Sequence, residues 1–166
     1  MKKPWSLMWV AKFVARWEGF LPHAYLDTIA SPEVWTIGYG HTGPDVHAGM
    51  VVGKAEALRL LAHDLRMAAR AVKSGIHVKL AVRQRMALIS LAFNCGAGAV
   101  VGSTLAAKLN AGDYRGAAEC FLEWDHAGGV VVEGLLNRRK AEKWMFEHPK
   151  KRPKHNPHHP KRKASR

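Results

Sequence analysis

The sequence reads EGFLPHAYLD from Glu18 to Asp27 and VWTIGYGHT from Val34 to Thr42. The first segment sets two carboxylates nine residues apart, and the second alternates apolar and polar residues around closely spaced glycines. Such alternation predicts a small antiparallel sheet over residues 23–42. Glycoside hydrolysis needs one protonated carboxylic acid and one ionised carboxylate. The pair alone is a weak indication, because any basic globular domain contains several such pairs.

Helical periodicity flanks the predicted sheet on both sides. Apolar spacing predicts a helix over residues 6–18 with Glu18 at its end. Further helices are predicted over residues 53–72, 80–94, 104–110, 114–122 and 135–147. Glycines 96, 98 and 102 predict an end to the helix over 80–94, and Gly128-Gly129 predicts a turn. The pattern indicates an α+β fold with a small sheet lobe and a larger helical lobe.

Charge is distributed unevenly along the 166 residues, which carry a net charge of +13. Residues 148–166 hold eight Lys or Arg, four prolines and no acid, whereas residues 1–147 hold 18 basic and 13 acidic side chains. We therefore expect one folded domain, residues 1–147, and an extended, mobile basic tail, residues 148–166. The excess of positive charge predicts attraction to polyanions but does not say which.

The cysteines and the N-terminal segment indicate the cellular compartment in which the protein is made. Cys95 and Cys120 are too few for a disulfide framework, and their apolar neighbours predict small buried side chains. Lys12 and Arg16 interrupt the N-terminal apolar run, and no apolar run approaches the ~20 residues of a membrane span. We expect no exported leader and no anchor.

Three motifs together resemble the active-site region of the phage-type lysozymes, glycoside hydrolase family 24. They are Glu18-Gly-Phe, Tyr25-Leu-Asp27-Thr and Trp35-Thr36-Ile-Gly-Tyr-Gly-His41. Segments 93–96, 103–113 and 134–142 extend the resemblance over roughly residues 14–146. The resemblance implies a lysozyme-like fold with its cleft between the lobes. It also implies a phage endolysin that hydrolyses the β-1,4 bond between N-acetylmuramic acid and N-acetylglucosamine, with inversion.

The resemblance assigns catalytic roles to three residues. Glu18 would protonate the leaving oxygen, while Asp27 and Thr36 would position and activate the attacking water. The apolar neighbours Trp17 and Phe20 would favour a protonated Glu18 by desolvation. Composition alone favours an ordinary solvated glutamate at a helix end, and the resemblance reverses that preference.

The spacing of the third residue departs from the family. Eight residues separate Asp27 from Thr36, where the family has five, so three residues are inserted around Ser31-Pro32-Glu33. An outward bulge would keep Thr36 facing Asp27. An odd register shift would turn Thr36 to the opposite face of the sheet. In that case Thr28 or Glu33 would take its place.

The resemblance also assigns supporting roles. His41 would be structural, paired as an imidazolium with Asp64 on the next helix, since nothing nearby completes a metal set. Arg138 and Arg139 match the segment in which an arginine pairs with the catalytic glutamate, and either alone reads equally as a basic helix face. Asn94 would bind substrate. No cofactor or metal is implied.

The implied partners are peptidoglycan and, through the basic tail, an anionic bacterial envelope. We expect a monomer that waits in the host cytoplasm until a holin opens the membrane, and no specific nucleic acid. Three alternatives stay open. They are a lytic transglycosylase acting on the same bond, a cationic nucleic-acid-binding protein, and a catalytically inactive relative whose tail disrupts membranes.

Overall fold

The computed structural model describes residues 7–28 and 32–149, and the chain divides into two compact units, residues 1–69 and 70–166. We call the first the sheet unit and the second the helical unit, and describe each by itself. The predicted α+β class is confirmed. The basic tail from residue 150 onward lies outside the described residues.

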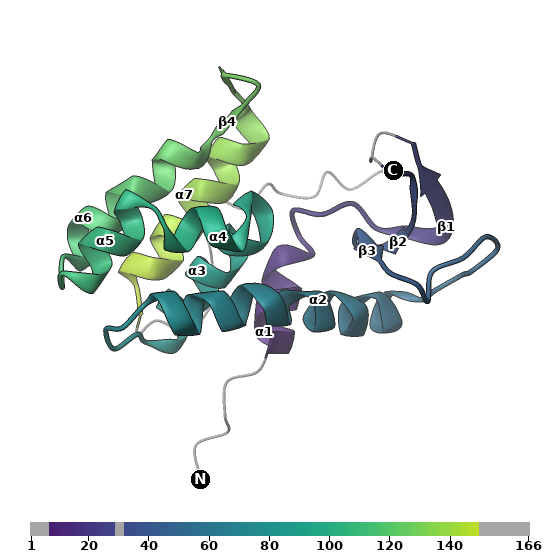
Figure 1. Cartoon of the computed structure of the whole chain (residues 1–166), viewed down its shortest axis with the longest axis horizontal. Coiled ribbons are helices and arrows are strands. Elements are labelled where there is room, and N and C mark those ends of the chain that lie inside the picture. Colours follow the sequence, from purple (N-terminus) through teal and green to yellow (C-terminus); the bar gives the residue numbers. More distant parts are fainter. Residues whose placement is uncertain (1–6, 29–31, 150–166) are drawn as a thin grey trace, which may run out of the picture. The chain divides into compact units, whose positions relative to one another are not determined.

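The sheet unit consists of one short helix, a three-stranded sheet and the first part of a long helix. Its elements are α1 (Leu7–Val14), β1 (Leu21–Asp27), β2 (Val34–Gly38), β3 (His41–Thr42) and the start of α2 (Lys54–Gly75). The strands are antiparallel in the order β1-β2-β3 (Figure 1). The sheet predicted over residues 23–42 is therefore confirmed, with β1 starting slightly earlier.

One face of β2 packs against α2. Ile37 is fully buried in a cluster with Val46, Val52 and Ala57. Gly38 has φ +69°, and a Cβ on it would lie 3.0 Å from the Cβ of Ala57. A glycine is thus needed both for the backbone angle and for the close approach of the helix. Because side chains alternate along a strand, the residue before Ile37 belongs to the opposite face of the sheet.

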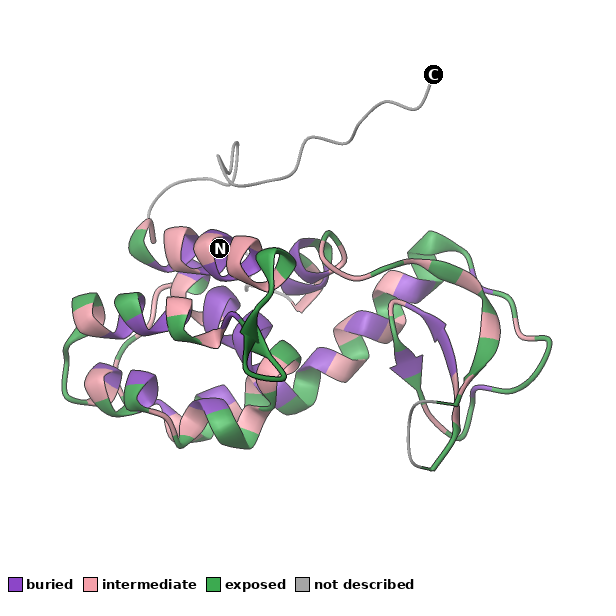
Figure 2. Cartoon of the chain, turned by 90° about the horizontal axis from the view of Figure 1, so that it is seen from above, coloured by how far each residue is buried: buried purple, intermediate pink, exposed green. Residues whose placement is uncertain are grey.

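The buried face of α2 differs from the face that its leucines predict. Ala57, Leu61, Leu65, Ala68 and Val72 are buried along it. The sequence correctly predicts Leu61 and Leu65. Two other predicted positions, residues 58 and 69, are only partly buried, because the helix turns residues 57 and 68 toward the core instead. Exposed and buried side chains alternate along this helix (Figure 2).

The helical unit is built around a central helix. Its elements are α3 (Val82–Cys95), α4 (Ala97–Val101), α5 (Thr104–Asn110), α6 (Tyr114–Glu119), the 3-10 helix η1 (Cys120–Trp124), β4 (His126–Ala127), β5 (Val130–Val131) and α7 (Glu133–Glu147). The helix α3 packs against α7 and buries seven consecutive residues, 86–92, as its apolar sequence predicts. The side chain of Asp113 accepts a hydrogen bond from the Gly116 amide at 2.7 Å and caps α6, which was also predicted.

Three local features differ from the predictions. The glycine-rich stretch after α3 contains the short helix α4, although a break was predicted there. The helix predicted over 114–122 is an α-helix that tightens into the 3-10 helix η1. Gly128 and Gly129, with φ +58° and +80°, do more than turn the chain, since they connect β4 and β5 into a hairpin.

Neither cysteine is in a disulfide. Cys120 is buried, as predicted, whereas Cys95 is half-buried. No helix in the described part of the chain is long and apolar enough to cross a membrane.

Candidate active site

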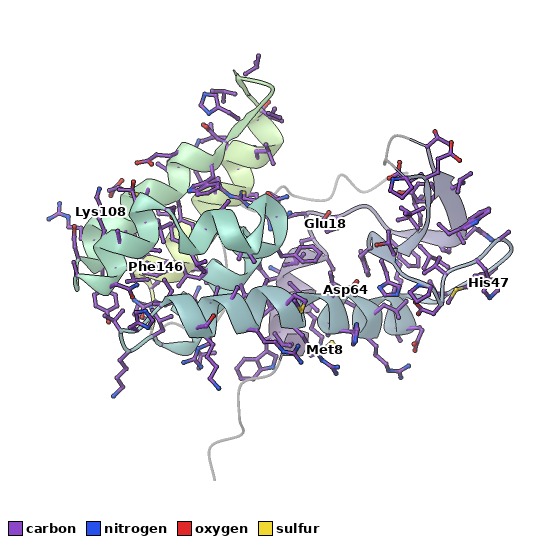
Figure 3. The ribbon with its side chains drawn as sticks, in the orientation of Figure 1. Met8, Glu18, His47, Asp64, Lys108 and Phe146 are labelled. Carbon is purple, nitrogen blue, oxygen red and sulfur yellow. The ribbon has the colours of Figure 1, made fainter. Side chains whose placement is uncertain are left out.

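Glu18 lies on the connection between α1 and β1 (Figure 3). The helix ends at Val14, four residues before the predicted end, and the chain continues in turns. The amides of Trp17 and Glu18 both donate to the Val14 carbonyl, at 2.8 and 3.2 Å. Phe20 then packs on Tyr39 with ring centroids 5.3 Å apart. The half-buried Glu18 is thus held between a helix end and an anchored aromatic ring.

Asp27 and Thr36 lie on the same face of the sheet. In the β1–β2 ladder, Tyr25 stands opposite Thr36, and Asp27 stands opposite Val34. Paired residues of antiparallel strands share a face, as do residues two apart on one strand. Thr36 is therefore the diagonal neighbour of Asp27. The longer spacing between these residues is taken up in the connection before Val34, and the alternative in which Thr36 faces the other way does not apply to this register.

The hydroxyl of Thr36 is buried and has no hydrogen-bond partner among the described residues. Its residue is 4% exposed, in the middle strand of the sheet, between Tyr25 on β1 and Thr42 on β3. Buried hydroxyls in proteins nearly always have a partner, and an exception often has a functional reason. A hydroxyl in this position can accept from one group and donate to another, which is what orienting a water requires.

His41 is clamped by carboxylates on two sides. Its Nδ1 lies 2.8 Å from an Asp64 oxygen on α2, as the resemblance implied, and its Nε2 lies 3.3 Å from Asp45. His63 also approaches Asp64, at 3.5 Å. The imidazole is almost completely buried. The contact joins β3 to α2, so it connects the sheet to the helix beneath it.

The surroundings of His41 favour the imidazolium. Burial, the largest single influence, lowers the pKa of His41. Hydrogen bonds and charge from Asp64, followed by those from Asp45, together outweigh burial and raise the pKa above its ordinary value of 6.5. A backbone hydrogen bond, followed by the His41 contact, lowers the pKa of Asp45. This arrangement suits a structural ion pair.

Both arginines contact Glu142 within the helical unit, and the pairing of an arginine with Glu18 stays a prediction. The Nε of Arg139 lies 2.7 Å from Glu142, and the Nε of Arg138 lies 3.3 Å from the same carboxylate. The hydroxyl of Ser90 on α3 donates to Glu142 at 2.6 Å. Glu142 and Arg139 are fully buried, and Arg138 is nearly so. This buried network fixes α7 against α3.

Asn94 lies at the edge of that network. Its side-chain oxygen accepts from the Arg139 guanidinium at 2.9 Å, and the same nitrogen donates to the Cys95 sulfur at 2.9 Å. The contact orients the Asn94 amide, with its NH₂ group directed away from the bond to arginine. The same guanidinium is therefore a fixed polar neighbour of the half-buried Cys95.

Sequence reasoning missed Asp45, Ser90 and Glu142. Asp45 could have been found from its position four residues after His41. Glu142 could have been found from its spacing, because it follows Arg138 and Arg139 by four and three residues on a helix. Ser90 carries no such signal, since a single serine within an apolar helix does not reveal its partner.

Comparison with known proteins places the whole arrangement in context. The Phage lysozyme family model matches residues 15–142. The Endolysin of Bacillus phage B103 is 38% identical over 133 residues, or 80% of this chain, and the chain spans 50% of that relative's length.

Solved structures agree with the sequence comparison. A mutant of P22 lysozyme superposes with a TM-score of 0.75 at 37% identity, covering 83% of this chain and 94% of that one. The muramidase domain of SpmX from Asticaccaulis excentricus gives a TM-score of 0.73 at 30% identity, covering 82% of this chain and 93% of that one. The resemblance found in the motifs is thereby confirmed for most of the chain.

Proposed function

The chain belongs to the phage lysozyme family of peptidoglycan-lytic enzymes, and on this premise we propose that it is a muramidase. It hydrolyses the β-1,4 bond between N-acetylmuramic acid and N-acetylglucosamine and thereby lyses a bacterial host. The observation that carries the proposal is the buried hydroxyl of Thr36, which has no hydrogen-bond partner in the described part of the chain and lies diagonal to Asp27 on one face of the sheet. The similarity to a muramidase domain supports the choice of bond.

Each proposed role follows from the chemistry of its group. Glu18 donates its proton to the glycosidic oxygen, which leaves with the adjoining sugar. Asp27 accepts a proton from water, while the Thr36 hydroxyl orients that water toward the anomeric carbon. The water attacks from the face opposite the leaving group, so the product carries an inverted anomeric centre. Asp27 then releases its proton to solvent and Glu18 takes one up, which restores the starting state.

The proposal is tested by digesting purified peptidoglycan in ¹⁸O-labelled water and analysing the fragments by mass spectrometry. Hydrolysis gives reducing-end muramic acid with one labelled oxygen for each bond cleaved. A lytic transglycosylase gives unlabelled 1,6-anhydro ends, and that result would overturn the proposal. Proton NMR of freshly released product then reports whether the anomeric configuration is inverted.

Amino-acid substitutions test whether Glu18 is the catalytic carboxylate. Glu18→Gln should lower turnover by roughly 10²–10⁴-fold, the usual contribution of a general acid. Glu133→Gln is the matched control, because it neutralises an exposed carboxylate at the start of α7, outside the proposed site. An equal loss in both variants would show that Glu18 has no special role.

The biological setting belongs to the same proposal. We infer that the enzyme acts as a monomer, waits in the host cytoplasm until a holin releases it, and uses the basic tail to attach to anionic envelopes. Expression in a Gram-negative host with and without a co-expressed holin tests the release step. Lysis that starts at the same time in both cultures would contradict holin dependence.

A further inference from the structure

A row of basic side chains follows the exposed side of α2. Its members are Arg59, His63, Arg66, Arg70 and Lys73, and all five are exposed. Their spacings of four, three, four and three residues keep them on one line of a helix, because a helix has 3.6 residues per turn. The row is about 21 Å long, at 1.5 Å per residue. Since α2 is one continuous helix, its own geometry sets this row.

Two carboxylates of α2 contact the first two members of the row. The only carboxylates of α2 are Glu56 and Asp64. Glu56 lies at the N-terminal end, where it pairs with Arg59. Asp64 contacts His41 at 2.8 Å and also approaches His63 of the row at 3.5 Å. Between Arg66 and Lys73 the helix itself has basic residues and no carboxylate.

An apolar side chain accompanies the charges. Met67 stands next to Arg66 and is 67% exposed, the highest value among the exposed large apolar residues. Its position one turn after His63 and just before Arg70 places it beside the basic row. Methionine is flexible and common at adaptable binding surfaces, and helices that lie at a membrane surface combine cations with apolar side chains.

We propose that this row, together with Met67, docks α2 lengthwise on the surface of a bilayer containing anionic phospholipid. The row extends about 21 Å along one line of the helix, so it fits an extended surface better than a single small anion. Positive side chains near an anionic membrane each contribute about 1 kcal/mol, or roughly fivefold in affinity, at moderate salt. The docking is independent of hydrolysis and uses none of the proposed catalytic residues.

The test is co-sedimentation of the full chain with vesicles of phosphatidylcholine containing 30 mol% phosphatidylglycerol. The first variant is Arg59→Gln/Arg66→Gln/Lys73→Gln, which removes three charges one heptad apart in the row. The matched control is Lys12→Gln/Lys79→Gln/Arg115→Gln, which removes three exposed charges outside it. Both variants have the same net charge and keep the basic tail.

We expect the row variant to lose on the order of a hundredfold in vesicle affinity and the control to lose less than about fivefold. Met67→Ser should weaken binding without any change in charge. Equal losses in the two charge variants would overturn the proposal, because binding would then depend on net charge or the tail. A row variant that loses affinity for duplex DNA but keeps its affinity for vesicles would also overturn the proposal. Circular dichroism and unchanged hydrolysis of purified peptidoglycan establish that all variants are folded.

Discussion

Thr36 offers the most direct residue-scale test. Thr36→Val keeps the shape and the strand propensity of the side chain but removes the hydroxyl. We expect turnover on peptidoglycan to fall roughly 10²-fold, as for loss of a proton-transfer partner. The melting temperature should stay the same or rise, because the hydroxyl has no partner among the described residues. Thr36→Ser is the control that keeps the hydroxyl, and full activity in the valine variant would remove Thr36 from the mechanism.

His41 should affect stability more than catalysis. Its pKa is raised in the folded protein, so its contribution to stability is fully present below pH 6.5 and is lost as the pH rises through the raised value. The charged groups that face it are Asp64, Asp45 and, through Asp64, His63. We therefore expect the melting temperatures of wild type and His41→Asn to differ most near pH 5.5 and to converge toward about pH 8.

Two measurements check this reading of His41. Thermal unfolding followed by circular dichroism gives the pH dependence of the difference, and a gap that is constant from about pH 5.5 to 8 would contradict it. Turnover measured well below the melting temperature should stay within a few-fold of wild type. A large loss of activity in a folded His41→Asn protein would instead place the imidazole in catalysis.

Between elements, the strongest polar contact joins α3 and α7 through Glu142. Glu142→Ala would leave two buried guanidinium groups without their carboxylate, which should lower the free energy of unfolding by about 3–5 kcal/mol. Glu119→Gln is the control, because the Glu119 side chain is 60% exposed and its ion pair with Lys143 should contribute less than about 1 kcal/mol. Urea unfolding measures both changes. A cost for Glu142→Ala as small as that of the control would show that the network does not fix α7.

The elements differ in how far the sequence reveals them. Long helices are predicted for two reasons, since the apolar residues of α2 recur with helical period whereas α3 is apolar on nearly all sides. The short helix α4 is not, since Gly96 and Gly98 lower helix propensity and only the surrounding packing compensates. The β4–β5 hairpin also escapes detection, because two-residue strands carry no periodicity and only the Gly128-Gly129 turn is visible.

At the scale of the whole molecule, the basic tail and the folded part should act separately. Deleting residues 150–166 removes eight positive charges and should lower killing of intact Gram-negative cells while hydrolysis of purified peptidoglycan is unchanged. The cut belongs after Pro149, because the His148 carbonyl accepts from Arg83 at 2.9 Å and its ring stacks on Trp144. Cell viability and release of soluble muropeptides measure the two activities. An equal loss of cell killing and of peptidoglycan hydrolysis would refute the separate action of the tail and the folded part.

The candidate site shows what sequence can and cannot predict. The motifs around Glu18, Asp27 and Thr36 identify the residues because they match a known family. They leave open which face Thr36 occupies, since that depends on the parity of a strand register and not on residue type. The pairing of His41 with Asp64 was likewise implied only by resemblance. Contacts across 23 residues of chain follow from the fold and from no local pattern.

The connection from Asp27 to Val34 has a practical consequence. The β1–β2 ladder closes at this pair, so residues added beyond it need not alter the pairing of Tyr25 with Thr36. Enzymes of this kind could therefore acquire or lose loop residues there without changing the alignment of the neighbouring strands. For protein engineering, the same place is an insertion site for a recognition peptide that redirects the enzyme to another bacterial surface.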